Sequence, residues 1–148
     1  MKTIALSVFL ILLCLAPTKA GPAEEKAFTD KYKTAFEAKD MATLQSLFYT
    51  TGADPTILGF YQMMLAAEAG NKISKIELVT LSPEEAQKAS GAQESPGGGK
   101  VCLPLKPTKK LVVEVSMKSD QGSSNSKTEN FVAEKDGKFV IPVPGPCK

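Results

Sequence analysis

Apolar residues recur at helical spacing near the start of the chain and at alternating positions further along. Phe28, Tyr32, Ala35 and Phe36 stand at i, i+4, i+7 and i+8, a spacing that places their side chains on one face of a helix. Charged residues fill the opposite side of the same stretch. The pattern predicts an amphipathic helix over Glu24–Lys39.

Two further helices are predicted after it. Asp40 is a good N-cap for a helix that runs to about Tyr49. Asp54 caps a third helix with Pro55 at its first position, where the missing N–H costs nothing, and Gly70 is its expected stop. The third helix has so many apolar positions that contact on two sides is expected: Ile57, Leu58, Phe60, Tyr61, Met64, Leu65 and Ala69.

The middle of the chain combines strands with a short helix. Lys72–Leu81 reads as a strand, and Ser82 begins a capping box for a helix that ends near Ser90. Gly91–Lys100 is expected to be a loop, and its glycines a flexible connector, since no phosphate-binding pattern surrounds them. Val101–Pro107 is interrupted twice by proline and fits an edge segment better than a central strand.

The clearest alternation in the sequence lies in Leu111–Lys118, with Leu111, Val113, Val115 and Met117 on one side. This stretch is predicted to be a strand. The polar run Ser119–Ser126 is expected to be a turn.

A hairpin is predicted around Asp136-Gly137, because Asp-Gly favours the type I′ turn whose twist suits two antiparallel strands. Both of its faces are apolar, so cover on both sides is expected. One face carries Val132, Phe139 and Ile141, and the other carries Phe131, Ala133 and Val140. Helices followed by antiparallel strands predict an α+β fold, with N-terminal helices packed on a curved, mostly antiparallel sheet.

The first 20 residues have the layout of a secretory signal peptide. Lys2 supplies positive charge, Ile4–Ala16 is apolar, and Thr18-Lys19-Ala20 precedes a cleavage site before Gly21. The apolar run is too short to cross about 30 Å of hydrocarbon as a helix. Cys14 raises the alternative of a lipid-modified cysteine, although the bulky Leu13 precedes it. We therefore expect a signal peptide over 1–20 and a single α+β domain over 21–148.

Composition excludes several kinds of chemistry. The chain has 18 basic and 16 acidic residues, and loss of Lys2 and Lys19 with the leader balances the charge. No basic field for nucleic acid or anionic lipid is then expected, nor any membrane association after cleavage. Every basic residue is lysine, and without histidine the chain lacks the commonest metal ligand and general base. We expect no cofactor, metal or catalytic residue.

Two cysteines follow the leader, Cys102 and Cys147. An even pair in a small exported domain predicts one disulfide, with a reactive thiol or a metal pair as the alternatives.

The order of elements resembles the nuclear-transport-factor-2-like superfamily, whose topology is also called cystatin-like. The resemblance lies in the opening FTDKYKTAFEAKDMATLQSLF and in the closing VAEKDGKFVIPV, and it covers residues 24–143. It implies a cone-like fold in which Phe139 packs on the helices. Residues 82–107 depart from the family pattern as an insertion, and the inhibitor motif Gln-x-Val-x-Gly of the true cystatins is absent.

Catalytic members of this superfamily place an Asp inside the cone, often with His or Tyr. Here Asp40 and Asp54 are explained as helix caps, Asp136 by its turn, and Asp30 lies on the charged side of its helix. The candidate ligand-binding residues are aromatic side chains expected to line the cone, although at helical spacing such residues commonly belong to the core: Tyr32, Phe36, Tyr49 and Tyr61.

The sequence thus favours a secreted protein, periplasmic or extracellular, that acts as a non-catalytic binding or interaction module. Its expected partner is a small apolar ligand or a second copy bound through the sheet. The alternatives are an isomerase- or hydratase-like enzyme with a buried Asp and Tyr, an envelope structural protein, and a protease inhibitor.

Overall fold

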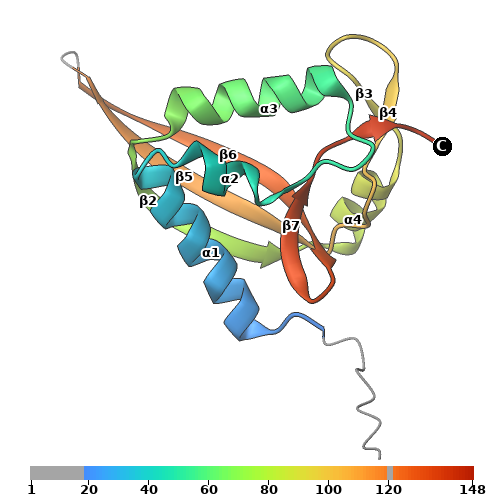
Figure 1. Ribbon diagram of the computed structural model, residues 1–148, viewed down its shortest axis with the longest axis horizontal. Coiled ribbons are helices and arrows are strands. Elements are labelled where there is room, and N and C mark those ends of the chain that lie inside the picture. The colour runs from blue at the N-terminus through green and yellow to red at the C-terminus, as the bar shows by residue number, and fades with distance from the viewer. Residues whose placement is uncertain (1–18, 120–121) are drawn as a thin grey trace, which may run out of the picture.

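The computed structural model describes residues 19–119 and 122–148 (Figure 1). The predicted leader lies outside this range except for Lys19 and Ala20. The helices are α1 (Pro22–Glu37), α2 (Met41–Gln45), α3 (Pro55–Glu68) and α4 (Pro83–Ser90). The strands are β1 (Phe48–Tyr49), β2 (Lys72–Thr80), β3 (Gln93–Glu94), β4 (Lys100–Cys102), β5 (Lys109–Ser119), β6 (Gly122–Lys135), β7 (Lys138–Pro142) and β8 (Gly145–Pro146).

The predicted α+β class is confirmed. Five strands form a mixed sheet in the order β1-β7-β6-β5-β2, and three short strands form a second sheet in the order β3-β4-β8. All pairs in the large sheet are antiparallel except β1 with β7, which is parallel. Helices α1, α2 and α3 lie over one face of the large sheet, while α4 and the small sheet lie toward one end of it (Figure 1).

Helix α1 forms where the apolar spacing predicts it. Its buried residues are the four that the pattern selects: Phe28, Tyr32, Ala35 and Phe36. At its start, the backbone N–H of Gly21 donates to the Glu24 carboxylate at 2.8 Å, which satisfies one of the free N–H groups of a helix N-terminus.

Helix α2 begins as predicted but ends sooner. Asp40 caps it by accepting a hydrogen bond from the Thr43 N–H at 3.0 Å. The helix was expected to reach Tyr49, yet it ends at Gln45, and Phe48–Tyr49 forms β1. Phe48 pairs with Ile141 of β7, so a long-range strand pairing outweighs the local helical spacing.

Helix α3 has the predicted caps and one unpredicted open side. Asp54 accepts hydrogen bonds from the N–H groups of Thr56 at 2.8 Å and Ile57 at 3.1 Å, and Gly70 has a positive φ of 98° just after the helix. Contact on two sides was expected. Instead α3 leaves three large apolar side chains exposed, namely Phe60, Met63 and Met64.

Strand β6 is longer than its composition suggests. The polar stretch Ser119–Ser126 was expected to be a turn, but Ser123–Ser126 pairs with β5 in register, for example Ser126 with Val115. The pairing of β5 with β6 continues as far as Ser119 with Gly122. Backbone pairing with the long β5 sustains this polar part of the strand, which has no apolar side chains of its own.

The terminal hairpin has the predicted geometry. Asp136 and Gly137 both have positive φ, 53° and 72°, as a type I′ turn requires, and Glu134 pairs with Phe139. Phe139 packs edge-on against Phe28 of α1 with ring centroids 6.2 Å apart, which is the contact implied by the resemblance. The core on this side also buries Val132, Ile141, Leu111, Val113 and Val115.

The opposite face of the large sheet is partly covered by the insertion. Ala133 is fully buried there, while Phe131 and Val140 are half-buried. Helix α4 lies against this face. Its Glu85 carboxylate accepts a hydrogen bond at 2.6 Å from Nζ of Lys110, which pairs with Phe131 in the sheet. Alternation along β5 points Lys110 away from the buried Leu111.

The predicted disulfide is present. Cys102 of β4 and Cys147 are bonded, with their Cα atoms 4.9 Å apart. The bond fastens the chain after β8 to the insertion, and β4 pairs with β8 beside it. The insertion is thereby held to the C-terminal segment.

Candidate functional site

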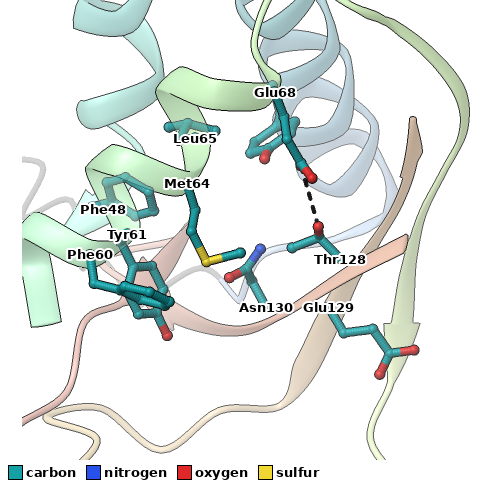
Figure 2. Close-up of a pocket in the computed structure, with 10 residues that line it drawn as sticks. Phe48, Phe60, Tyr61, Met64, Leu65, Glu68, Thr128, Glu129 and Asn130 are labelled. Atoms are coloured by element: carbon teal, nitrogen blue, oxygen red, sulfur yellow. Dashed lines mark hydrogen bonds between the residues drawn. The ribbon is translucent and has the colours of Figure 1, made fainter. Parts of the chain in front are cut away.

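A pocket of about 220 Å³ lies between α3 and the helix-facing side of β6 (Figure 2). Its walls come from β1, α3 and the distant strand β6, plus Tyr32 of α1. The lining residues are Tyr32, Phe48, Phe60, Tyr61, Met64, Leu65, Glu68, Thr128, Glu129 and Asn130.

One end of the pocket is aromatic. Phe48 and Tyr61 meet edge-on with ring centroids 6.0 Å apart and planes at 89°. Phe48 reaches this place because β1 is paired with β7 rather than continuing α2. Burial raises the pKa of the Tyr61 phenol, so Tyr61 stays neutral at physiological pH.

The mouth of the pocket is apolar and open to solvent. Phe60 and Met64 line it and are 45% and 43% exposed, respectively. Met63, also on α3, is 63% exposed but does not line the pocket. Large, solvent-exposed apolar side chains at the rim of a concave site are typical of ligand-binding and protein-binding surfaces.

The other end of the pocket is polar and holds a carboxylate. Glu68, the final residue of α3, accepts a hydrogen bond from Ser126 Oγ at 2.7 Å and a longer one from Thr128 Oγ1 at 3.5 Å. Figure 2 shows Glu68 and Thr128 together, apart from the aromatic cluster of Phe48, Phe60 and Tyr61. The hydroxyls belong to alternate residues of β6 and so share its helix-facing side.

Glu129 lines the pocket, but its side chain points away from it (Figure 2). Its carboxylate lies on the outer face of the sheet, 2.8 Å from Lys127 Nζ and 3.2 Å from Lys110 Nζ. The hydrogen bonds from these two lysines lower the pKa of Glu129. Its negative charge is therefore already compensated outside the pocket.

Tyr32 belongs both to the pocket lining and to the hydrophobic core. It is 4% exposed and stacks on Phe36 with ring centroids 5.9 Å apart. Burial, with a smaller contribution from the charge of Glu68, raises the pKa of Tyr32 well above its usual range. Tyr32 therefore keeps its proton and adds no negative charge beside Glu68.

The four aromatic residues proposed from the sequence are divided between different places. Tyr32 and Tyr61 line the pocket. Phe36 is 1% exposed and lies in the core behind Tyr32. Tyr49 pairs with Pro142 in the sheet and does not line the pocket.

Sequence reasoning missed Glu68, Phe60 and Met64 as pocket residues. A signal for Glu68 was available, because it follows Tyr61 by seven residues and Met64 by four on the same helix. Those spacings place all three on one face of α3. A glutamate on the same helix face as apolar residues is unusual, and this pattern could have identified Glu68 as a candidate site residue.

The four aspartates considered in the sequence analysis have structural roles. Asp40 and Asp54 cap helices, Asp136 occupies its turn, and Asp30 pairs with Lys26 one helical turn away. None of the aspartates in the described part of the chain lines the pocket. Residues 19–119 and 122–148 also contain no cluster of acidic or cysteine side chains that could hold a metal ion.

A scan against protein-family models found no matching family, and searches of curated proteins and of solved structures found no match either. The Cys102–Cys147 bond indicates an oxidising compartment. No helix within the described residues has the length and apolar character needed to cross a bilayer.

Proposed function

We propose that this chain is an exported, non-catalytic binding protein that holds a small, mainly apolar ligand in the pocket between α3 and β6. The observation that carries the proposal is the aromatic-lined pocket with exposed Phe60 and Met64 at its mouth. Ligand sites are typically concave and mostly apolar, with a few placed polar groups. Pockets for drug-sized ligands have volumes of roughly 300–1,000 Å³, so a pocket of about 220 Å³ suits a smaller ligand, such as a single ring or a short chain.

Two further features support export and the scaffold. The leader pattern in residues 1–20 and the Cys102–Cys147 bond both suit a periplasmic or extracellular protein. The contact of Phe139 with Phe28 suits a scaffold similar to the nuclear-transport-factor-2-like superfamily. In that scaffold a ligand would lie between the helices and the sheet, where this pocket is.

An isomerase- or hydratase-like enzyme is the second candidate, because Glu68 and Tyr32 line the same pocket. The sequence-based version of this hypothesis required an aspartate, and Glu68 would take that role. Binding is favoured because two hydroxyl groups donate to the Glu68 carboxylate and occupy lone pairs with which a general base would accept a proton. No observation on the described residues favours a protease inhibitor or an envelope structural protein.

The test is a titration of the purified domain with the neutral single-ring compound 2-phenylethanol, followed by the amide signals of the protein in two-dimensional NMR. We expect shifts concentrated on α3 and on β6 near Thr128, with a dissociation constant on the order of a millimolar. Met64→Gln should weaken binding several-fold. Met63→Gln makes the same change on the same helix outside the pocket and should not.

Two outcomes would contradict the proposal. One is the absence of shifts up to the solubility limit of the compound. The other is an equal effect of the Met63 and Met64 substitutions. Native mass spectrometry of protein purified from its own host would then report any co-purified ligand directly.

A further inference from the structure

The pocket has two chemically different ends separated along α3. Tyr61 and Glu68 are seven residues apart, which corresponds to about 10 Å along a helix axis. Figure 2 shows Met64 and Leu65 between the aromatic cluster and Glu68. A ligand that fills the pocket would therefore place an apolar part at one end and another group beside a carboxylate.

Glu68 differs from three other half-buried glutamates in its partners, and it is the one of the six in the described residues that faces into the pocket. Like Glu68, Glu114 and Glu134 lack a described lysine within 4 Å, but they do not line the pocket. Glu25, Glu37 and Glu85 each have a lysine ammonium within 4 Å. No ammonium lies that close to Glu68 among residues 19–119 and 122–148, and its described side-chain partners are the hydroxyls of Ser126 and Thr128. No cation therefore compensates this half-buried negative charge, and burying an uncompensated charge is unfavourable.

The position of Glu68 on its helix adds to this imbalance. As the final residue of α3, it stands at the negative end of the helix dipole, where a carboxylate is disfavoured and a cation is favoured. Residues that oppose a local rule are expected mainly at functional or strained sites. The second carboxylate of the lining, Glu129, is directed outward and paired, so it does not share the role.

We propose that the ligand is a small organic cation, an amine with one aromatic or short aliphatic group, whose ammonium binds Glu68 while its apolar part lies among Phe48, Tyr61 and Met64. An ammonium carries three donors and can bond the carboxylate together with the oxygens of Ser126 and Thr128. An anion would meet the charge of Glu68 and the end of the helix dipole. This inference rests on the proposed function of the pocket and specifies the ligand class.

Three probes of nearly equal size test the charge preference: 2-phenylethylammonium, 2-phenylethanol and phenylacetate. Their dissociation constants are measured at neutral pH for the wild-type domain. We expect the ammonium to bind about ten-fold more tightly than the alcohol, and phenylacetate to bind most weakly. The Glu68→Gln variant should bind the ammonium and the alcohol equally.

Glu129→Gln is the matched control, because it removes an equal charge from a lining residue whose side chain points away. It should keep the preference for the ammonium. Glu68→Gln retains an oxygen that can accept from Ser126, so its NMR spectrum should show an intact fold.

Each remaining outcome decides the question. Equal binding of ammonium and alcohol by the wild type, or tighter binding of phenylacetate, overturns the inference and leaves a neutral or anionic ligand in the pocket. The inference is also overturned if Glu129→Gln abolishes the preference for the ammonium as fully as Glu68→Gln does. Failure of all three probes to bind overturns the proposed function as well.

Discussion

Gly145 and Gly52 approach so closely that a β-carbon added to Gly145 would lie 1.8 Å from the carbonyl oxygen of Gly52. Next to this contact, the backbone N–H of Asp54 donates to the carbonyl of Pro144 at 2.9 Å. Asp54 caps α3, so the segment around β8 fixes the start of the helix that forms one side of the pocket. A glycine is needed at 145 because no side chain fits between the two backbones.

Gly145→Ala should therefore be strongly destabilising. Backbone atoms lie against the new methyl group and cannot rotate away, so we expect a loss of about 3 kcal/mol or more in the free energy of unfolding, at the upper end of the usual range for overpacking or beyond it. Chemical denaturation measures the change. Gly59→Ala is the control, since it lies inside α3 with nothing within 4 Å of the added carbon and should gain about 1 kcal/mol. Equal stability of the two variants would contradict the close contact.

Replacing both Cys102 and Cys147 by serine should lower the free energy of unfolding by about 4 kcal/mol, the value of the chain-entropy model for residues 45 apart in sequence. The bond limits the freedom of the unfolded chain between β4 and the C-terminal segment. Denaturation of the double variant beside the oxidised wild type measures the loss. Peptide mapping without reductant should find the two cysteines linked, and two free thiols in the native protein would refute the bond.

Acid should loosen α4 before the rest of the fold. The hydrogen bond from Lys110, with help from the Ser82 N–H and hydroxyl, lowers the pKa of Glu85 from 4.5 to about 2. Because the folded value lies below the unfolded one, this carboxylate stabilises the fold above pH 4.5. That contribution is lost as the pH falls from 4.5 toward 2.

Hydrogen exchange of the α4 amides between pH 5 and pH 2, corrected for the intrinsic acid dependence, follows this release. We expect protection of α4 to fall across that window while the buried strand β5 stays protected. In Glu85→Gln the protection of α4 should be lower at pH 5 and nearly independent of pH. A wild-type α4 whose protection does not change with pH would show that the Glu85–Lys110 pair does not hold the helix.

Association through the outer face of the sheet is a prediction that the apolar pattern raised. Phe131 and Val140 are half-buried on that face, and α4 shares a crevice with Phe131 through Glu85 and Lys110. Because the insertion already covers part of the face, we expect the domain to sediment as a monomer. Val140→Lys should leave the sedimentation coefficient unchanged. A dimer that Val140→Lys dissociates would show instead that two sheets meet across a two-fold axis.

Much of the fold follows from local rules that the sequence displays. The apolar face of α1, the caps Asp40 and Asp54, the Asp136-Gly137 turn and the cysteine pair each depend on neighbouring residues or simple counting, and all are confirmed. The places of β1 and of Ser123–Ser126 depend on partners far along the chain. Neither helical spacing nor polarity reports such a partner, so both were assigned wrongly.

The site was harder to predict than the fold for a different reason. Phe60 and Met64 have the same apolar character as the buried Ile57 on the same helix, so composition cannot distinguish a pocket wall from a core. Which side of α3 stays open depends on where β6 lies opposite it. The role of Glu68 likewise depends on Ser126 and Thr128, which come close only in the folded chain.

The position of β7 between β1 and β6 has a consequence for how the protein is made on the ribosome. Residues 138–147 are synthesised after every element that they join: β1, β6, the start of α3 and Cys102. Until they emerge, β1 has no strand to pair with and the pocket lacks a fixed wall. We therefore expect this domain to close only after residues 138–147 have left the ribosome, later than the pairing of β5 with β6.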